Sequence, residues 1–206
     1  SGTALVAGAL AMRGAWTGPV AGPSPDNAKG FFENVRLRDV SEMALAKARY
    51  FGITADPLCL SVKVLEGFPI PDIREAVAAE IEAQGYVGGP WLYKDPRMAA
   101  LWSVWAKAFP KAKWVVVERN IADTAASLRR ASFSKDKPVD WEVWAMGMSG
   151  RLADLWNGVE NKRYAVPDLI VAGNMAGFDR VTEWCGLEAR PLNGFVDPLL
   201  WKGSGA

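Results

Sequence analysis

The chain has 206 residues, of which 50% are hydrophobic and 23% are charged, and its formal net charge is +1. These values fit one globular α/β domain and argue against a protein that coats nucleic acid or an acidic membrane surface. The chain contains no histidine, so a proton acceptor has to come from Asp, Glu, Lys, Tyr or Cys.

The two cysteines, Cys59 and Cys185, lie far apart in the sequence. Such a pair fits reduced thiols in a cytoplasmic protein better than a disulfide framework. No metal-ligand spacing is present, and no apolar run reaches the roughly 18 residues typical of a membrane span. We therefore expect a cytoplasmic protein without a metal site or a membrane partner.

Apolar periodicity and helix-ending residues predict a mostly helical chain. In chain order, helices are expected over residues 3–13, 39–52, 71–85, 96–109, 120–130, 139–160 and 174–186. The fourth of these has Asp95 as its N-cap and Pro96 at its first position. Residues 18–30 are rich in proline and glycine, which predicts an irregular active-site loop.

Two segments favour β-strands. The run from Trp114 to Val117 is fully apolar, which is typical of a strand in the middle of a parallel sheet covered on both faces. Residues 162–173 are also strand-like. We further expect a strand before Ser1, because an α/β domain normally brings a strand up to a loop that opens a helix. The predicted fold is a single α/β domain over residues 1–206, with a central, mostly parallel sheet flanked by helices.

The first residues, SGTA, form a small-residue turn at the start of a helix. Ser1 and Thr3 bring hydroxyl groups, Gly2 allows close approach of the backbone, and the free N–H groups up to Ala4 point outward. This arrangement predicts a cradle for a phosphate or sulfate. The alternative is an ordinary helix N-cap, for which the same residues are common.

An arginine ends the apolar strand, and a serine follows it eight residues later. Side chains at the carboxyl edge of a parallel sheet enter the crevice where ligands bind. A partly buried arginine there is costly unless it meets an anion. Arg119 and Ser127 are therefore predicted to hold one phosphate together. In the alternative interpretation Arg119 pairs with Asp123 and Ser127 is solvated.

Motifs along nearly the whole chain resemble those of the PAPS-dependent sulfotransferases, especially their bacterial branch (PAPS is 3′-phosphoadenylyl sulfate). In order, they are SGT, NAKGFFEN, the run from Tyr93 to Leu128, and the segment from Asp168 to Leu187. The resemblance implies a P-loop NTPase-like sulfotransferase fold. It also implies that the first loop holds the 5′-phosphosulfate, whereas Arg119 and Ser127 grip the 3′-phosphate.

The chain departs from the family pattern at several places. The family's basic residue before S-G-T would precede Ser1, and Ile121 stands where proline is usual. The late R-K-G-x-x-G phosphate motif has only a faint echo in WKGSG, which predicts Lys202 as a further PAPS contact. The histidine base of cytosolic animal members lies in a K-x-H segment that corresponds here to KDP, so that base is missing.

Glu33 is the general base that we predict instead, because other branches of the family use a glutamate soon after the first helix. The neighbouring Phe31 and Phe32 would partly desolvate its carboxylate and so increase its basicity. Alternatively, Glu33 is a helix-start residue close to Lys29 or Arg36.

Asp95 is the competing base, although helix capping already explains a carboxylate before Pro96. Lys94 is predicted to stabilise the leaving phosphate or the sulfuryl oxygens, with Arg97 as a second choice. Tryptophans at helical spacing are candidates for an acceptor pocket or for the core: Trp91, Trp102, Trp105, Trp141 and Trp144.

The expected function is transfer of a sulfuryl group from PAPS to a hydroxyl or amine of a small-molecule, glycan or peptide acceptor, without a metal. A P-loop small-molecule kinase is the alternative enzyme, but it should show G-x-x-x-x-G-K-[ST], and SGTA has no lysine after the glycine. A non-catalytic module that binds PAP, the desulfated product of PAPS, is the other alternative. The sequence leaves the acceptor and the oligomeric state open.

Overall fold

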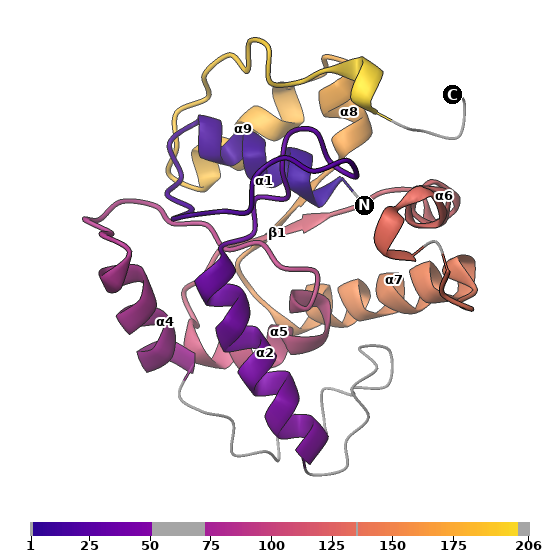
Figure 1. Cartoon of the computed structure of the whole chain (residues 1–206). Coiled ribbons are helices and arrows are strands. Elements are labelled where there is room, and N and C mark those ends of the chain that lie inside the picture. The colour runs from indigo at the N-terminus through magenta and orange to yellow at the C-terminus, as the bar shows by residue number, and fades with distance from the viewer. Residues whose placement is uncertain (1, 51–72, 135, 202–206) are drawn as a thin grey trace.

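The computed structural model describes residues 2–50, 73–134 and 136–201, which form helices around a small parallel sheet (Figure 1). The expected α/β class is confirmed. The helices are α1 (Thr3–Met12), α2 (Val35–Tyr50), α4 (Ile73–Ala83), α5 (Met98–Ala108), α6 (Ile121–Arg130), α7 (Trp141–Gly158), α8 (Pro167–Val171) and α9 (Ala176–Trp184). The strands are β1 (Trp114–Val117) and β2 (Lys162–Ala165), and 3-10 turns lie at η1 (Ser132–Ser134) and η2 (Pro198–Leu200).

The sheet of the described residues contains β1 and β2, paired in parallel from Trp114↔Lys162 to Val117↔Ala165. The strand predicted at residues 114–117 is confirmed, but its predicted place in the middle of the sheet is wrong for this part of the chain, where β1 pairs on one edge only. Helices do cover both of its faces, as expected, and this coverage explains the apolar run.

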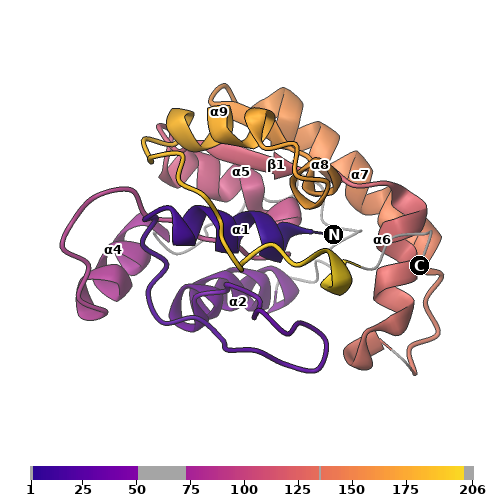
Figure 2. The same cartoon turned by 90° about the horizontal axis from the view of Figure 1, so that it is seen from above.

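The two faces of β1 pack against different helices. Val115 and Val117 join a core cluster with α1, α8 and α9. Val116 points the other way and packs with α5 and α7. A third cluster joins α2 and α4 to the far side of α5. In both views α1 lies between α2 and α9 (Figure 1 and Figure 2).

Side-chain caps set the starts of several helices. Asn120 accepts a hydrogen bond from the N–H of Ala122 at 2.8 Å and begins α6, and Asp140 accepts one from Glu142 at 3.0 Å and begins α7. Asn34 likewise accepts from Leu37 at 3.1 Å, so α2 starts at Val35, before the predicted residue 39.

Three predicted boundaries need comment. The strand-like stretch predicted over residues 162–173 is wrong beyond Ala165, because Pro167 occupies the first turn of α8. Helix α5 begins at Met98 with Arg97 as its N-cap, so Asp95 lies in the preceding turn and does not occupy the predicted N-cap. Two predicted boundaries, the end of one helix at residue 52 and the start of the next at residue 71, lie outside the described residues.

No helix within the described ranges is both long and apolar enough to cross a membrane.

Candidate functional site

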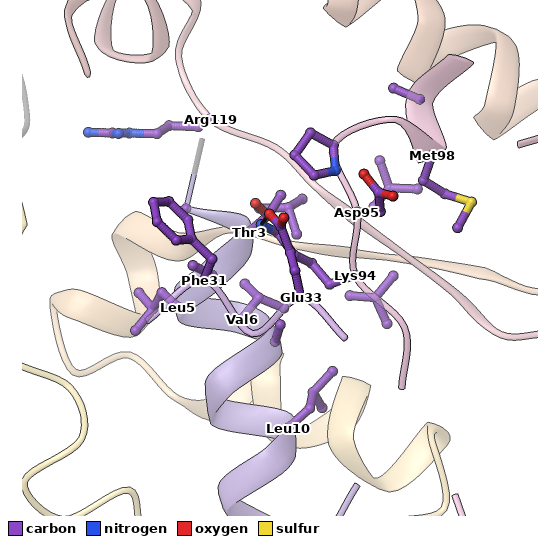
Figure 3. A pocket seen from close by; sticks show the side chains of 18 of the residues that line it. Thr3, Leu5, Val6, Leu10, Phe31, Glu33, Lys94, Asp95, Met98 and Arg119 are labelled. Carbon is purple, nitrogen blue, oxygen red and sulfur yellow. Dashed lines mark hydrogen bonds and ion pairs between the residues drawn. The ribbon is translucent and has the colours of Figure 1, made fainter. Parts of the chain in front are cut away.

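A cavity of about 1610 Å³ lies at the carboxyl end of β1 and continues along the strand. Its lining comes from the first turns of α1, residues 25–33, residues 89–99, β1, α6 and α7. We call the part of the cavity lined by Thr3, Glu33, Lys94, Arg119 and Ser127 the crevice. Figure 3 shows several of these side chains gathered from segments far apart in the sequence.

The two predicted catalytic residues are in direct contact. The Nζ atom of Lys94 lies 2.6 Å from Oε1 of Glu33, and the side chains are only 11% and 16% exposed. The ring of Phe31 lies 5.8 Å from the same ammonium group. The alternative partners of Glu33, Lys29 and Arg36, are not the ones it meets: its ion pair is with Lys94.

The segment that carries Glu33 is held in an unusual backbone conformation. Phe32 has a φ of 54°, in the left-handed region that non-glycine residues rarely adopt. Its ring packs edge-on against Phe195 at 5.8 Å and lies over Gly8 of α1, where a Cβ atom would come within 2.6 Å of Phe32 Cε2. The absence of a side chain at Gly8 thus makes room for Phe32, which turns the adjacent Glu33 toward Lys94.

The start of α1 forms one wall of the crevice. Gly2 is the N-cap, with a left-handed φ of 74° and no side-chain cap. A Cβ atom at this position would lie 2.5 Å from Pro167 Cγ and 3.0 Å from Trp201 Cη2, so only glycine fits. The first turn of α1 contains no acidic residue, and its partial positive charge faces the cavity that Gly2, Thr3 and Ala4 line. Ser1 lies outside the described residues.

Arg119 and Ser127 line the same cavity, Arg119 directly after β1 and Ser127 on α6. The Arg119 guanidinium stacks over the ring of Trp201 at 4.2 Å. Burial lowers the pKa of this guanidinium, while the carboxylates of Asp123 and Asp168 oppose the shift. Asp123, the alternative partner suggested by the sequence, is thus one of two carboxylates whose charge acts on Arg119, and Arg119 also lines the cavity.

Arg119 points away from the Glu33–Lys94 pair (Figure 3). The crevice therefore has two cationic ends, one at Lys94 and one at Arg119, with the first turn of α1 in between. Such a spacing suits a ligand with more than one anionic group. Lys202, the other predicted phosphate contact, lies outside the described residues.

Asp95, the competing base, is buried in a network of its own. Its Oδ2 accepts a hydrogen bond from the Tyr93 hydroxyl at 2.5 Å, and its Oδ1 accepts from the N–H and Nη1 of Arg97 at 2.9 and 3.0 Å. Burial and the Asp95 carboxylate raise the pKa of Tyr93, so its hydroxyl stays a donor. Arg97 also pairs with Glu42 at 2.5 Å. These contacts tie α5 to α2 and leave both oxygens of Asp95 already engaged.

The predicted tryptophans divide between cavity and core. Trp141 and Trp144 of α7 line the cavity and meet edge to face at 6.0 Å. Trp91 and Trp105 also line it, although both pack into the core. Trp102 does not line the cavity: it is 7% exposed and packs in the core with Val116 and Leu155.

Trp201 is a residue of this site to which the sequence motifs assign no role. Its ring lies between Gly2 and Arg119, and its Nε1 donates to Asp168 at 2.9 Å. The only signal was its place directly before Lys202 in WKGSG. Phe133 and Lys137, between α6 and α7, line the cavity without any motif to mark them.

The crevice as a whole presents cations, helix N–H groups and one carboxylate. Within the described ranges, no group of His, Cys, Asp and Glu side chains is placed to hold a metal ion. Comparison with protein-family models, with curated proteins and with solved structures found no match to this chain. Functional assignment therefore depends on the geometry of the crevice and on the motifs of the sequence.

Proposed function

We propose that this protein is a PAPS-dependent sulfotransferase that moves a sulfuryl group to a hydroxyl or amine. The observation that carries the proposal is the 2.6 Å contact between Lys94 and Glu33 in a cavity that Thr3, Arg119 and Ser127 also line. These residues come from separate motifs of the sequence that the resemblance assigns to one reaction. The α/β arrangement is compatible with a P-loop-like sulfotransferase fold, which is part of the proposal.

The Arg119 end of the crevice and the start of α1 together hold the donor. Arg119 and Ser127 bind the 3′-phosphate of PAPS, Arg119 through charge-assisted hydrogen bonds. The N–H groups at the start of α1, from Gly2 to Ala4, face the 5′-phosphosulfate with the positive end of the helix. Trp201 keeps the Arg119 guanidinium in place by stacking at 4.2 Å.

Lys94 and Glu33 act on the transferring group and on the acceptor. The acceptor oxygen attacks sulfur, the bond between sulfur and the bridging phosphate oxygen breaks, and PAP leaves with that electron pair. The proton of the acceptor hydroxyl passes to Glu33. The Lys94 ammonium stabilises the negative charge that develops on the leaving oxygen. Binding of the anionic donor draws Lys94 toward the sulfuryl group and thereby frees the Glu33 carboxylate to accept the proton.

A thermal-shift screen with PAP, PAPS, ADP and ATP, each with and without magnesium, tests the donor assignment. A ligand at a hundredfold excess over its Kd stabilises the native state by about 2.7 kcal/mol. PAP and PAPS should raise the Tm by this route without magnesium, and ADP should do so much less because it lacks the 3′-phosphate. Equal stabilisation by ADP and PAP would contradict the proposal.

Transfer is then measured with labelled PAPS against a panel of phenols, alcohols, amines and saccharides. Labelled acceptor that depends on the protein supports a sulfotransferase. Selective PAP binding without transfer to any acceptor in the panel would instead favour the non-catalytic binding module.

A further inference from the structure

A hairpin between α1 and α2 forms part of the wall of the cavity. Val20 and Asn34 make its base, as an antiparallel bridge. We call residues 22–30, which lie beyond this base, the tip. Residues 25–30 all line the cavity. Figure 2 shows the loop between α1 and α2 extending toward α6.

A tight turn gives the tip its shape. The backbone N–H and carbonyl groups of Ser24 and Asn27 bond to each other in both directions, each at 3.0 Å. The N–H of Gly30 also donates to the Asn27 carbonyl at 3.0 Å. Pro25 and Asp26 therefore occupy the two central positions of a turn, the first of which favours proline. This turn places Asp26 at the far end of the hairpin.

The carboxylate of Asp26 joins the tip to another wall of the cavity. Its Oδ1 accepts a hydrogen bond from the N–H of Ser132 at 2.7 Å, and its Oδ2 accepts one from the Ser132 hydroxyl at 2.5 Å. Ser132 begins η1, shortly after α6, where Ala131 and Phe133 line the cavity. We call the contact between Asp26 and Ser132 the latch.

Exposed polar contacts, more than apolar packing, hold the tip. Most of its residues are exposed, and the three core clusters of the described residues contain none of them. Lys29 adds a polar anchor to the latch, because its Nζ donates to the carbonyl of Gly194 at 3.1 Å. A segment with few buried apolar contacts opens locally at a much lower free energy than the whole domain unfolds.

The base of the hairpin, in contrast, is fixed in the core. Asn34 is 1% exposed, and its Nδ2 donates to the carbonyl of Thr17 at 2.8 Å and to Oε1 of Gln84 at 2.6 Å. The N–H of Ala21 donates to the carbonyl of Glu33 at 3.2 Å. Movement of the tip therefore leaves the Glu33 end of the hairpin in place.

We propose that the tip is a gate to the crevice, which the latch holds shut and which opens about Gly22 and Gly30 while the base stays fixed. Gly30 has a φ of 86°, a conformation that glycine adopts without strain. Release of Asp26 from Ser132 separates two walls of the cavity and lets ligands enter and leave. That these ligands are PAPS, PAP and the acceptor rests on the proposed function.

A thiol inside the cavity tests the gate without any ligand. Leu5 lines the cavity (Figure 3), so Leu5→Cys introduces the thiol into a chain that also carries Cys59→Ser and Cys185→Ser. Its rate of alkylation by iodoacetamide should rise by about tenfold or more with Asp26→Ala, which removes hydrogen bonds to a charged group. Asp136→Ala removes another exposed carboxylate and is the control, which should leave the rate unchanged.

Native-state hydrogen exchange measures the opening in the protein of natural sequence. The amide of Ser132 should exchange faster than that of Glu118, which donates to the carbonyl of Ala165 between β1 and β2 at 3.1 Å. Asp26→Ala should speed exchange at Ser132 by about tenfold or more and leave Glu118 unchanged. This pattern means that the latch opens without unfolding of the sheet.

Stopped-flow measurements with PAP connect the gate to the crevice. A gate that limits passage in both directions slows association and dissociation alike. Asp26→Ala should therefore increase both rate constants for PAP by a similar factor, and its Kd should stay nearly unchanged. A residue that holds the ligand itself would change the Kd, mostly through dissociation.

Three results would overturn the gate. In the first, the thiol at position 5 reacts equally fast with Asp26→Ala and with Asp136→Ala. In the second, the amides of Ser132 and Glu118 exchange at the same rate in the natural protein, so that opening requires global unfolding. In the third, Asp26→Ala speeds PAP dissociation alone. A complete lack of PAP binding would instead contradict the sulfotransferase assignment, and the thiol and exchange measurements would then decide about the gate by themselves.

Discussion

The ammonium group of Lys94 lies 2.6 Å from the carboxylate of Glu33, although 61 positions separate the two residues in the chain. Both side chains are largely buried, so each supplies the counter-charge that the other needs in a medium of low polarity. The pair also joins the segment before α2 to the segment before α5. Its position in the wall of the cavity makes it the most informative target for mutation.

The ion pair should show strong coupling in a double-mutant cycle. Lys94→Met or Glu33→Gln alone leaves a buried group without its partner, which should cost about 1 to 3 kcal/mol of unfolding free energy. The double variant removes both charges and should cost clearly less than the sum. Urea denaturation measures all four proteins. Strictly additive losses would mean that the two groups do not interact in solution.

Glu33→Gln should lower turnover by about 10² to 10⁴, the usual contribution of a positioned base, because the amide keeps the size of the side chain but cannot accept the proton. PAP affinity should stay nearly unchanged, as measured by calorimetry. Asp95→Asn is the matched control and should retain turnover if the fold is intact. The opposite pattern, with full turnover in Glu33→Gln and none in a folded Asp95→Asn, would make Asp95 the base.

Arg119→Ala should weaken PAP much more than AMP, because only PAP carries the 3′-phosphate assigned to this side chain. Loss of a charge-assisted hydrogen bond should cost about 1.5 to 3 kcal/mol of binding free energy. Arg119→Lys keeps the charge but not the planar stack on Trp201, and its affinity for PAP should be intermediate. If PAP and AMP lose equal affinity, Arg119 supports the fold or the 5′ end of the ligand instead.

Gly8→Ala should destabilise the protein and reduce turnover, because a Cβ atom there would collide with the rings of Phe32 and Phe195. Movement of Phe32 would shift the adjacent Glu33 away from Lys94. Gly150→Ala is the control: it lies in α7 with no atom within 4 Å of the added Cβ, so it should stabilise the helix by about 0.5 to 1 kcal/mol. Thermal denaturation compares the two. A Gly8→Ala protein as stable and active as Gly150→Ala would contradict the packing described for Phe32.

Local signals in the sequence predicted most helices and the first strand. Asn120 and Asp140 begin α6 and α7 because their side chains accept hydrogen bonds from N–H groups a few residues later, a contact that needs no distant partner. The strand β1 is also predictable from local sequence, because an unbroken apolar run indicates a strand that is buried on both faces. The apolar residues after Ala165 resemble a strand in composition, but Pro167 at the first turn of α8 starts a helix there.

The sequence by itself determined which chemical groups this protein has: no histidine, a carboxylate in NAKGFFEN, a lysine in KDP and an arginine at the end of a buried strand. Only the tertiary structure decided that Glu33 meets Lys94, that Asp95 is occupied by Tyr93 and Arg97, and that Trp201 covers Arg119. The physical reason is range. Caps and periodicity depend on neighbours within a few residues, whereas these contacts join segments whose approach is set by the packing of α1, α2 and α5 around one cavity.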